Sequence, residues 1–312
     1  MTFRTPLAIF TYNRPAHTRQ MLESIAVCRR QDECRIFLFS DGPKTSEQEQ
    51  VVQATRAVLR EGMDRLGAQL IEQPVNLGLA RSIVEGVTEL CDEFGRVIVL
   101  EDDMIVSPRF LDYMITALDR YQDDDRVSQV SGYMHPVDHP AHPDAFFLPL
   151  TTTWGWSTWK RAWELFRWDV KEASVDLQDQ AFRLAFDLDG AYPYSRMLED
   201  CLAGRNDSWG IRWWWSVFKA GSVVLHPRHS LVWVGGFDGT GTHAGVNTNM
   251  MSRSAQDVIS FPWKETFAFP PTTAVDWPAR ERIKKYLRVG AAPDARRGLK
   301  ARLTNFLKDH LI

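Results

Sequence analysis

Three consecutive acidic residues, Glu101, Asp102 and Asp103, directly follow a short apolar run at 96–100. Carboxylates this close repel one another unless a cation lies among them, and oxygen ligands suit Mg²⁺ or Mn²⁺. We therefore expect Asp103 to hold a divalent cation that neutralises a diphosphate, and Asp102 to bind a ribose hydroxyl. The alternative is a plain turn that caps the next helix. A second acidic triplet, 123–125, ends a predicted helix and is expected to be solvated.

Other polar clusters also follow apolar runs. They are 11–14, 40–41 and 76–81. Open parallel sheets bind ligands beyond the carboxyl ends of their strands, so one cleft could hold all of these clusters. The candidate donor contacts that they contribute, beyond the acidic triplet, are Thr11, Asn13, Arg14, Asp41 and Arg81.

Apolar runs and helical periods alternate over residues 1–131, which predicts βαβ units and a mainly parallel sheet with helices on both faces. The expected strands are 6–10, 35–39, 69–72, 96–100 and 127–131, and a helical period around residues 21–26 is followed by helices at 46–61, 79–92 and 108–121. After residue 132 the pattern changes. Helices are expected at 157–166, 177–187, 192–202 and 209–219, with short strands at 222–225 and 231–234.

The composition is that of a globular α/β protein of 312 residues with a net charge of −3. Its four cysteines form no CxxC pair, and no apolar run reaches the roughly 18 residues of a membrane helix. We expect a cytoplasmic protein that does not bind nucleic acid. Residues 1–278 are expected to form one domain, with a nucleotide-binding half (1–131) and an acceptor half with a lid (132–278).

Residues 279–312 are expected to form a basic helical tail. From residue 280 onward the chain carries ten Lys and Arg against three acidic residues. Such a tail could lie on the inner membrane face near a lipid-linked acceptor. The alternative is a helix that packs on the body or mediates self-association.

Nine of the twelve tryptophans lie between Trp154 and Trp215. Aromatic faces pack against the apolar faces of sugar rings, so Trp154, Trp156 and Trp209 are candidate acceptor or sugar contacts. Core packing is the alternative for each of them, because Trp156 shares a helical spacing with Trp159 and Trp163.

Asp207 lies just before a predicted helix and is the candidate general base, with a plain N-cap as the alternative. Glu199 and Asp200 form a competing carboxylate pair. The segment 235–245 has the composition of a mobile lid, and His243 within it could face a diphosphate.

Several well-known motifs are absent. No G-x-G-x-x-G follows the first predicted strand, and no P-loop, G-x-S-x-G or H-E-x-x-H occurs. A sugar-nucleotide enzyme with a bound metal is the remaining economical interpretation. A sugar-nucleotide pyrophosphorylase is one alternative, although it should show a Gly-rich phosphate loop after the first strand. A non-catalytic carbohydrate-binding protein is the other.

A set of short motifs, taken in chain order, indicates a protein family. They are Ile-Phe-Thr-Tyr-Asn-Arg (9–14), Phe-Ser-Asp-Gly (39–42), Val-Leu-Glu-Asp-Asp-Met-Ile-Val-Ser-Pro (99–108), Arg-Phe-Leu-Asp-Tyr (109–113), Gly-Trp (155–156), Asp-Ser-Trp-Gly-Ile-Arg (207–212) and 239–245. With these motifs the chain resembles GT-A glycosyltransferases, and among them the N-acetylglucosaminyltransferase I type, over about residues 6–248.

The resemblance implies a GT-A fold and an inverting, metal-dependent transferase with a UDP-like donor such as UDP-GlcNAc. It makes Arg14 a nucleotide or phosphate contact, Asp41 the uracil partner and Glu101 a donor-sugar contact. It also implies Mn²⁺ or Mg²⁺ on Asp103, with Asp102 on the ribose. Asp207 falls one position from the family's catalytic Asp before a Trp, because Ser208 intervenes here. His243 would be a second metal ligand, in a loop that orders over the donor.

Overall fold

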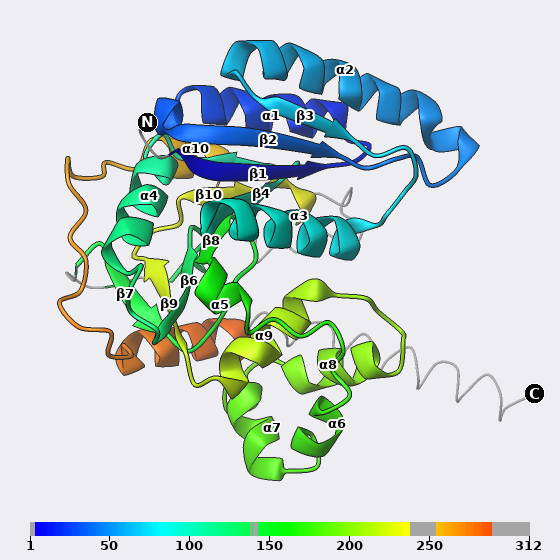
Figure 1. Ribbon diagram of the computed structural model, residues 1–312. Helices are drawn as coiled ribbons and strands as arrows, with labels where there is room; N and C mark the ends of the chain where they lie inside the picture. The colour runs from blue at the N-terminus through cyan, green and yellow to red at the C-terminus, as the bar shows by residue number, and fades with distance from the viewer. Residues whose placement is uncertain (1–3, 138, 140–142, 238–253, 289–312) are drawn as a thin grey trace, which may run out of the picture.

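The computed structural model describes residues 4–137, 139, 143–237 and 254–288. Within these residues, eight strands form one sheet in the order β3-β2-β1-β4-β8-β6-β9-β7 (Figure 1). Their bounds are β1 Thr5–Thr11, β2 Cys34–Ser40, β3 Gln69–Glu72, β4 Arg96–Glu101, β6 Val127–Ser131, β7 Ala145–Leu148, β8 Trp156–Trp159 and β9 Val223–Pro227. A separate antiparallel pair joins β5 (Met104–Val106) to β10 (Val232–Val234).

The sheet is mainly parallel, as the sequence predicts. Strands β3, β2, β1 and β4 run parallel, and β9 runs parallel to β6. Two strands run against them. β8 is antiparallel to both β4 and β6, and β7 is antiparallel to β9. The resulting α/β fold is the one that the resemblance to GT-A glycosyltransferases implies.

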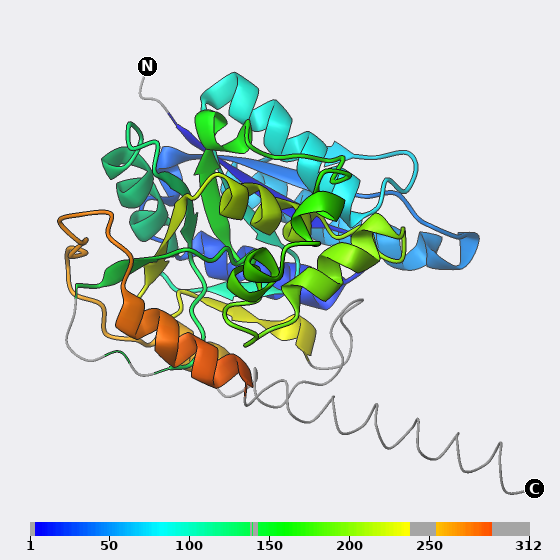
Figure 2. The same cartoon turned by 90° about the horizontal axis from the view of Figure 1, so that it is seen from below.

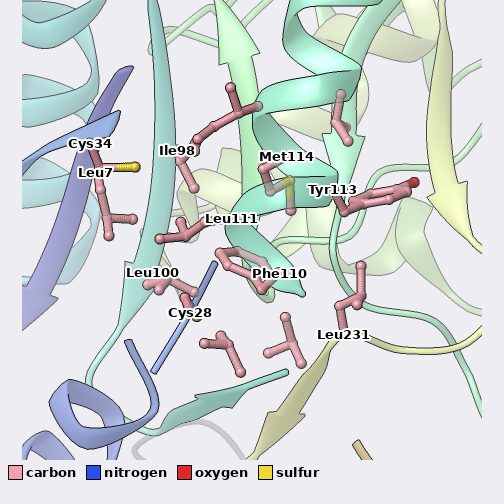
Figure 3. Packing of buried hydrophobic residues seen from close by; sticks show 14 of the residues in the cluster. Leu7, Cys28, Cys34, Ile98, Leu100, Phe110, Leu111, Tyr113, Met114 and Leu231 are labelled. Carbon is pink, nitrogen blue, oxygen red and sulfur yellow. The ribbon is translucent and has the colours of Figure 1, made fainter. Parts of the chain in front are cut away.

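Helices cover both faces of this sheet, because the side chains of each buried strand alternate between two cores. Leu7 and Ile9 of β1 pack in one hydrophobic cluster with α1, α2 and α4, whereas Ala8 and Phe10 pack in another with α3 and α9. Figure 3 shows the first cluster, where Leu100 of β4 lies beside Phe110. The helices are α1 Pro15–Ala26, α2 Glu49–Leu66, α3 Leu79–Phe94, α4 Phe110–Arg120 and α9 Trp209–Lys219.

The helix expected at 157–166 is wrong in its first turn. Residues 156–159 form β8 in the centre of the sheet, and only α5 (Lys160–Trp163) is helical. Trp156, Trp159 and Trp163 satisfy a helical spacing, but tertiary pairing with β4 decides the conformation. The strands β5 and β7 are also absent from the prediction.

A helical lobe with its own hydrophobic cluster follows β8 and α5. It is built from α6 (Ala173–Asp176), α7 (Gln180–Phe186), α8 (Tyr194–Leu202) and one face of α9. The helix at 277–288 packs on this lobe (Figure 2), with Ala279, Ile283 and Leu287 buried. This part of the basic segment therefore packs on the body, and the side chains of Ala279, Ile283 and Leu287 are not available to a membrane.

Three basic side chains of that helix converge on one acidic residue. Arg280 and Lys284 form ion pairs with the Asp189 carboxylate, and Arg288 donates a hydrogen bond to its carbonyl oxygen. Farther along the basic tail the sequence has the apolar residues Leu299, Leu303, Phe306 and Leu307, which lie outside the described residues. Within the described residues, no helix has the length and apolar character needed to cross a bilayer.

Two buried histidines make stability depend on pH. Burial lowers the pKa of His226 on β9 to about 4, and that of His135, which packs against Tyr133 and Tyr286, to about 3. The ordinary value is 6.5. Above pH 6.5 both histidines are neutral in the folded and the unfolded state. Below it the unfolded chain binds protons that the folded chain does not, so the free energy of unfolding falls until the folded pKa values are reached.

We predict that His226→Gln reduces this pH dependence. Each histidine contributes a slope of about 1.4 kcal/mol per pH unit between its unfolded and folded pKa values. Glutamine removes one titration and retains an N–H donor for the Leu150 carbonyl, which accepts from His226 Nε2 at 2.8 Å. Urea unfolding of both proteins between pH 7 and pH 4.5 measures the difference. An identical slope for the two proteins would contradict the prediction.

Candidate active site

The polar clusters predicted from the sequence meet at the carboxyl edge of β1, β2 and β4. Thr11 of β1 pairs with Ser40 of β2, and Phe10 pairs with Glu101 of β4. These three strands are parallel neighbours, so the segments that leave them begin side by side. Strand register therefore places residues 12–14, 41–42 and 102–103 along one edge, as expected.

The acidic turn contacts the first of these segments directly. The Tyr12 amide donates a hydrogen bond to Asp102 Oδ2 at 3.2 Å. Arg14 Nη1 lies 3.0 Å from Asp103 Oδ2 and 3.5 Å from Asp102 Oδ1. One guanidinium thus bridges the two aspartates that were expected to bind a ribose and a metal.

Negative charge in this turn exceeds the nearby positive charge. Burial, followed by the repulsion of Asp103, raises the pKa of Asp102 to about 7, and Arg14 opposes this shift. Burial and the same two aspartates raise the pKa of Glu101 well above its usual range. Among the described residues, Arg14 is the cation whose charge opposes both shifts.

These residues suit a divalent cation in charge and in ligand chemistry. Carboxylate oxygens are the ligands that Mg²⁺ and Mn²⁺ take, and a cation would relieve the repulsion that raises both pKa values. Among the described residues, no three His, Cys, Asp or Glu side chains are already grouped as a metal cage. His243, the expected second ligand, lies outside the described residues, as does most of the lid.

The first residues of that lid approach Asp103 closely. The antiparallel pair β5–β10 brings residue 235 beside the acidic turn, and the Gly235 amide donates to the Asp103 carbonyl at 2.7 Å. A Cβ at Gly236 would lie 2.3 Å from Asp103 Oδ2, which real atoms do not tolerate. Glycine at 236 is therefore required for Asp103 to keep this position. The composition of the lid predicted no such contact.

Asp41 is buried, and its carboxylate is occupied by its own chain. Oδ1 accepts from the amides of Gly42 and Leu77, both at 2.8 Å, and Oδ2 accepts from Asn76 Nδ2 and the Gly78 amide, both at 2.9 Å. Asp41 thus holds the loop before α3 against the edge of the sheet. Its expected contact with a nucleobase stays a prediction.

The remaining donor candidates differ in how they face the edge. The Thr11 hydroxyl points inward and donates to the Phe39 carbonyl at 3.0 Å. Asn13 is partly exposed between Tyr12 and Arg14. Arg81 is largely exposed on α3 and forms an ion pair with Glu85 at 2.6 Å.

Two of the three tryptophan candidates are core residues. Trp156 is fully buried, and Trp209 is buried against it with ring centroids 5.3 Å apart. Neither indole presents a face to a sugar in this structure, so the core alternative applies to both. Trp154 is partly buried, with its ring 4.7 Å from that of Tyr133.

Asp207 is exposed just before α9, and it is not the N-cap of that helix. Ser208 is the cap, and its hydroxyl accepts from the Ile211 amide. Among the described residues, none donates a hydrogen bond to the Asp207 carboxylate. The competing carboxylates are engaged, because Glu199 pairs with Arg183 and Asp200 pairs with Arg205.

The first turn of α9 lies near the edge that carries the acidic turn. The Cβ position of Gly210 is 3.2 Å from Thr153, in the loop that leads into β8. β8 begins at Trp156, which pairs with Val99 close to the end of β4. The chain therefore brings the segment of Asp207 toward Glu101. Sequence reasoning missed Arg212, which holds this segment by donating to the Asp207 carbonyl at 2.6 Å.

We predict that Asp41→Ala destabilises the fold. It leaves the amides of Gly42, Leu77 and Gly78 without this acceptor and removes one of the two acceptors of Asn76 Nδ2. The free energy of unfolding should fall by about 2–3 kcal/mol. Chemical denaturation measures this loss. Asp123→Ala, at an exposed aspartate, is the control and should change stability by less than about 0.5 kcal/mol. Equal stability of the two variants would show that Asp41 does not hold the loop.

Several solved glycosyltransferase structures are similar to this chain. A mannosyltransferase from Pyrobaculum calidifontis, in complex with GDP-Man and Mn²⁺, is 13% identical over 70% of this chain and 74% of its own, with a TM-score of 0.39. S. aureus TarS 1–349 in complex with UDP-GlcNAc is also 13% identical, with a TM-score of 0.32. That match covers 41% of this chain and 33% of TarS, so this chain spans about a third of that relative's length.

No curated protein matches the sequence. A family model described as Glycosyl transferase family 2 matches residues 7–184, more than half of the chain. The match contains most of β1, all of β2 and β4, and the acidic turn, and it ends before Asp207. It favours a transferase over the pyrophosphorylase and the binding protein that the sequence had left open. The chain therefore belongs to glycosyl transferase family 2.

Proposed function

We propose that this glycosyltransferase moves a sugar from a nucleotide diphosphate donor to a hydroxyl of a glycan or lipid-linked acceptor, with inversion. UDP-GlcNAc is the first donor to test. The observation that carries the proposal is the acidic turn at the carboxyl edge of β4, where Arg14 bridges Asp102 and Asp103. A donor carries a diphosphate and a ribose. At this edge the Arg14 guanidinium can bind the diphosphate, and the Asp102 carboxylate can accept a hydrogen bond from the ribose.

The donor-binding roles follow from charge. Arg14 is a fixed positive charge suited to a phosphate, and its guanidinium can hold two phosphate oxygens at once. Asp102 accepts hydrogen bonds, as recognition of a ribose hydroxyl requires. A divalent cation bound at Asp103 would supply positive charge to the departing diphosphate. Glu101 lies on the same edge, where it can accept from a donor-sugar hydroxyl.

The transfer step is a single displacement. An acceptor oxygen attacks the anomeric carbon, its proton passes to the Asp207 carboxylate, and the bond from the anomeric carbon to the phosphate oxygen breaks. The nucleoside diphosphate leaves with that electron pair. Support for Asp207 as the base comes from its exposed carboxylate, which does not cap α9 and forms no ion pair with any of the described residues. Glu199 and Asp200 both form ion pairs.

We predict that nucleotide binding depends on a divalent cation and on Asp103. Calorimetric titration of UDP, GDP, CDP and dTDP, each with and without Mn²⁺, should show that Mn²⁺ tightens the binding of UDP most. Asp103→Ala should abolish the Mn²⁺ effect and transfer while leaving the unfolding transition intact, because it removes a cation ligand.

Asp123→Ala is the matched control, since it removes a carboxylate from the other acidic triplet. A fully active, metal-independent Asp103→Ala enzyme would refute the metal role. Preference for another base would keep the enzyme class and discard the assigned role of Asp41.

We predict that Asp207→Asn lowers kcat by about 10²–10⁴-fold, because a general base contributes a factor of this size. The KM for the donor should change little, since the carboxamide keeps the shape of the side chain. Glu199→Gln and Asp200→Asn serve as controls and should retain most of the activity. A large loss of kcat in either control, together with an active Asp207→Asn enzyme, would move the base to α8.

A further inference from the structure

Two of the twelve tryptophans, Trp168 and Trp277, are exposed, with 47% and 58% of their surface accessible. Trp168 lies in the segment that joins α5 to α6, before the helical lobe. With about half of its surface in water, the Trp168 indole contributes less hydrophobic stabilisation to the fold than a buried tryptophan does. Exposure alone assigns no role, because single apolar residues on a surface are common. What distinguishes Trp168 is the group that holds it.

Arg212 of α9 fixes Trp168 in two ways. Its guanidinium carbon lies 4.7 Å from the ring centroid, and its Nε donates to the Trp168 carbonyl at 3.0 Å. Arg212 itself is only 9% exposed, so the guanidinium is part of the protein interior. The cation covers one side of the indole, and the accessible area therefore lies on the rest of the ring. Trp168 is a rigid aromatic surface with a buried support.

The same guanidinium holds the segment of the proposed base. Arg212 Nη1 donates to the Asp207 carbonyl at 2.6 Å, while Nε binds the Trp168 carbonyl. A guanidinium is planar and rigid, so it sets the two backbone positions relative to each other. An exposed aromatic ring and an exposed carboxylate are thus tied to one buried cation.

We infer that the open face of Trp168 is the stacking surface for the saccharide ring of the acceptor. This inference rests on the proposed function. Hydroxyls project from the edge of a pyranose, and its C–H groups form apolar faces that pack against an aromatic ring. A ring stacked on Trp168 would present a hydroxyl toward Asp207. Trp168 is then an acceptor-binding residue that takes no part in donor binding.

The test separates transfer from donor hydrolysis, in which water replaces the acceptor. The probes are the sugar nucleotide that the wild-type enzyme hydrolyses and the p-nitrophenyl glycosides of mannose, glucose, galactose and N-acetylglucosamine. For Trp168→Ala, the KM for the saccharide acceptor should rise at least tenfold, while donor hydrolysis and the donor KM stay within twofold. Trp168→Phe, which keeps an aromatic face, should recover part of the acceptor affinity.

Trp277→Ala is the matched control. Trp277 is also exposed beside an arginine, with Arg280 Cζ at 5.6 Å from its ring, but it lies on the helix at 277–288. This variant should match the wild type in both reactions. A Trp168→Ala enzyme with an unchanged acceptor KM would overturn the inference. So would equal loss of hydrolysis and transfer, since it would show that Trp168 only supports the fold around Asp207.

Two wild-type results also decide the matter. An enzyme that hydrolyses the donor but glycosylates none of the four probes would overturn the assignment of a saccharide to Trp168, and the proposed donor chemistry would stand. An enzyme that neither binds nor hydrolyses any sugar nucleotide would refute the proposed function, and the inference with it.

Discussion

Repulsion among three carboxyl groups at the end of a buried strand is the constraint on which the site depends. The continuous apolar character of β4 requires the strand to run through the interior, and it delivers Glu101, Asp102 and Asp103 to an edge with little water. Solvation cannot disperse charge there, so ordered positive charge must do so. Arg14 and the Tyr12 amide supply part of it, and both belong to the segment that follows the neighbouring strand.

The backbone places other residues against the acidic turn from two sides. Strand register sets Arg14 against the two aspartates, and the β5–β10 pair sets Gly235 and Gly236 against Asp103. Asp41 uses its charge differently, since it accepts hydrogen bonds from a loop of its own chain. Acidic residues on one edge therefore have different roles, because Asp41 holds a loop in place whereas Asp102 and Asp103 form ion pairs with Arg14.

The sequence predicted the elements whose signal is local. Continuous apolar runs located β1, β2 and β4, and with them the edge that carries the site. Conformations and roles that depend on tertiary contacts could not be predicted from the sequence. The spacing of Trp156 and Trp159 fits a helix, and only pairing with β4 makes it a strand. Asp207 and Ser208 are both good N-caps by residue type, and in the structure Ser208 caps α9. Arg212 ends the motif at 207–212, but the motif gave it no role, because one of the two carbonyls that it binds belongs to Trp168, 44 residues earlier in the chain.

The central position of β8 has a consequence for how the chain can be divided. β8 (156–159) follows β6 (127–131) in the sequence, yet it lies between β4 and β6 in the sheet. Residues 1–131 alone would leave the inner edges of β4 and β6 without their shared neighbour, and open edges of apolar strands are templates for association with other chains. During synthesis the sheet cannot close until residue 159 has emerged. The segments before and after residue 131 therefore share one sheet, and any cut between them passes through the middle of that sheet.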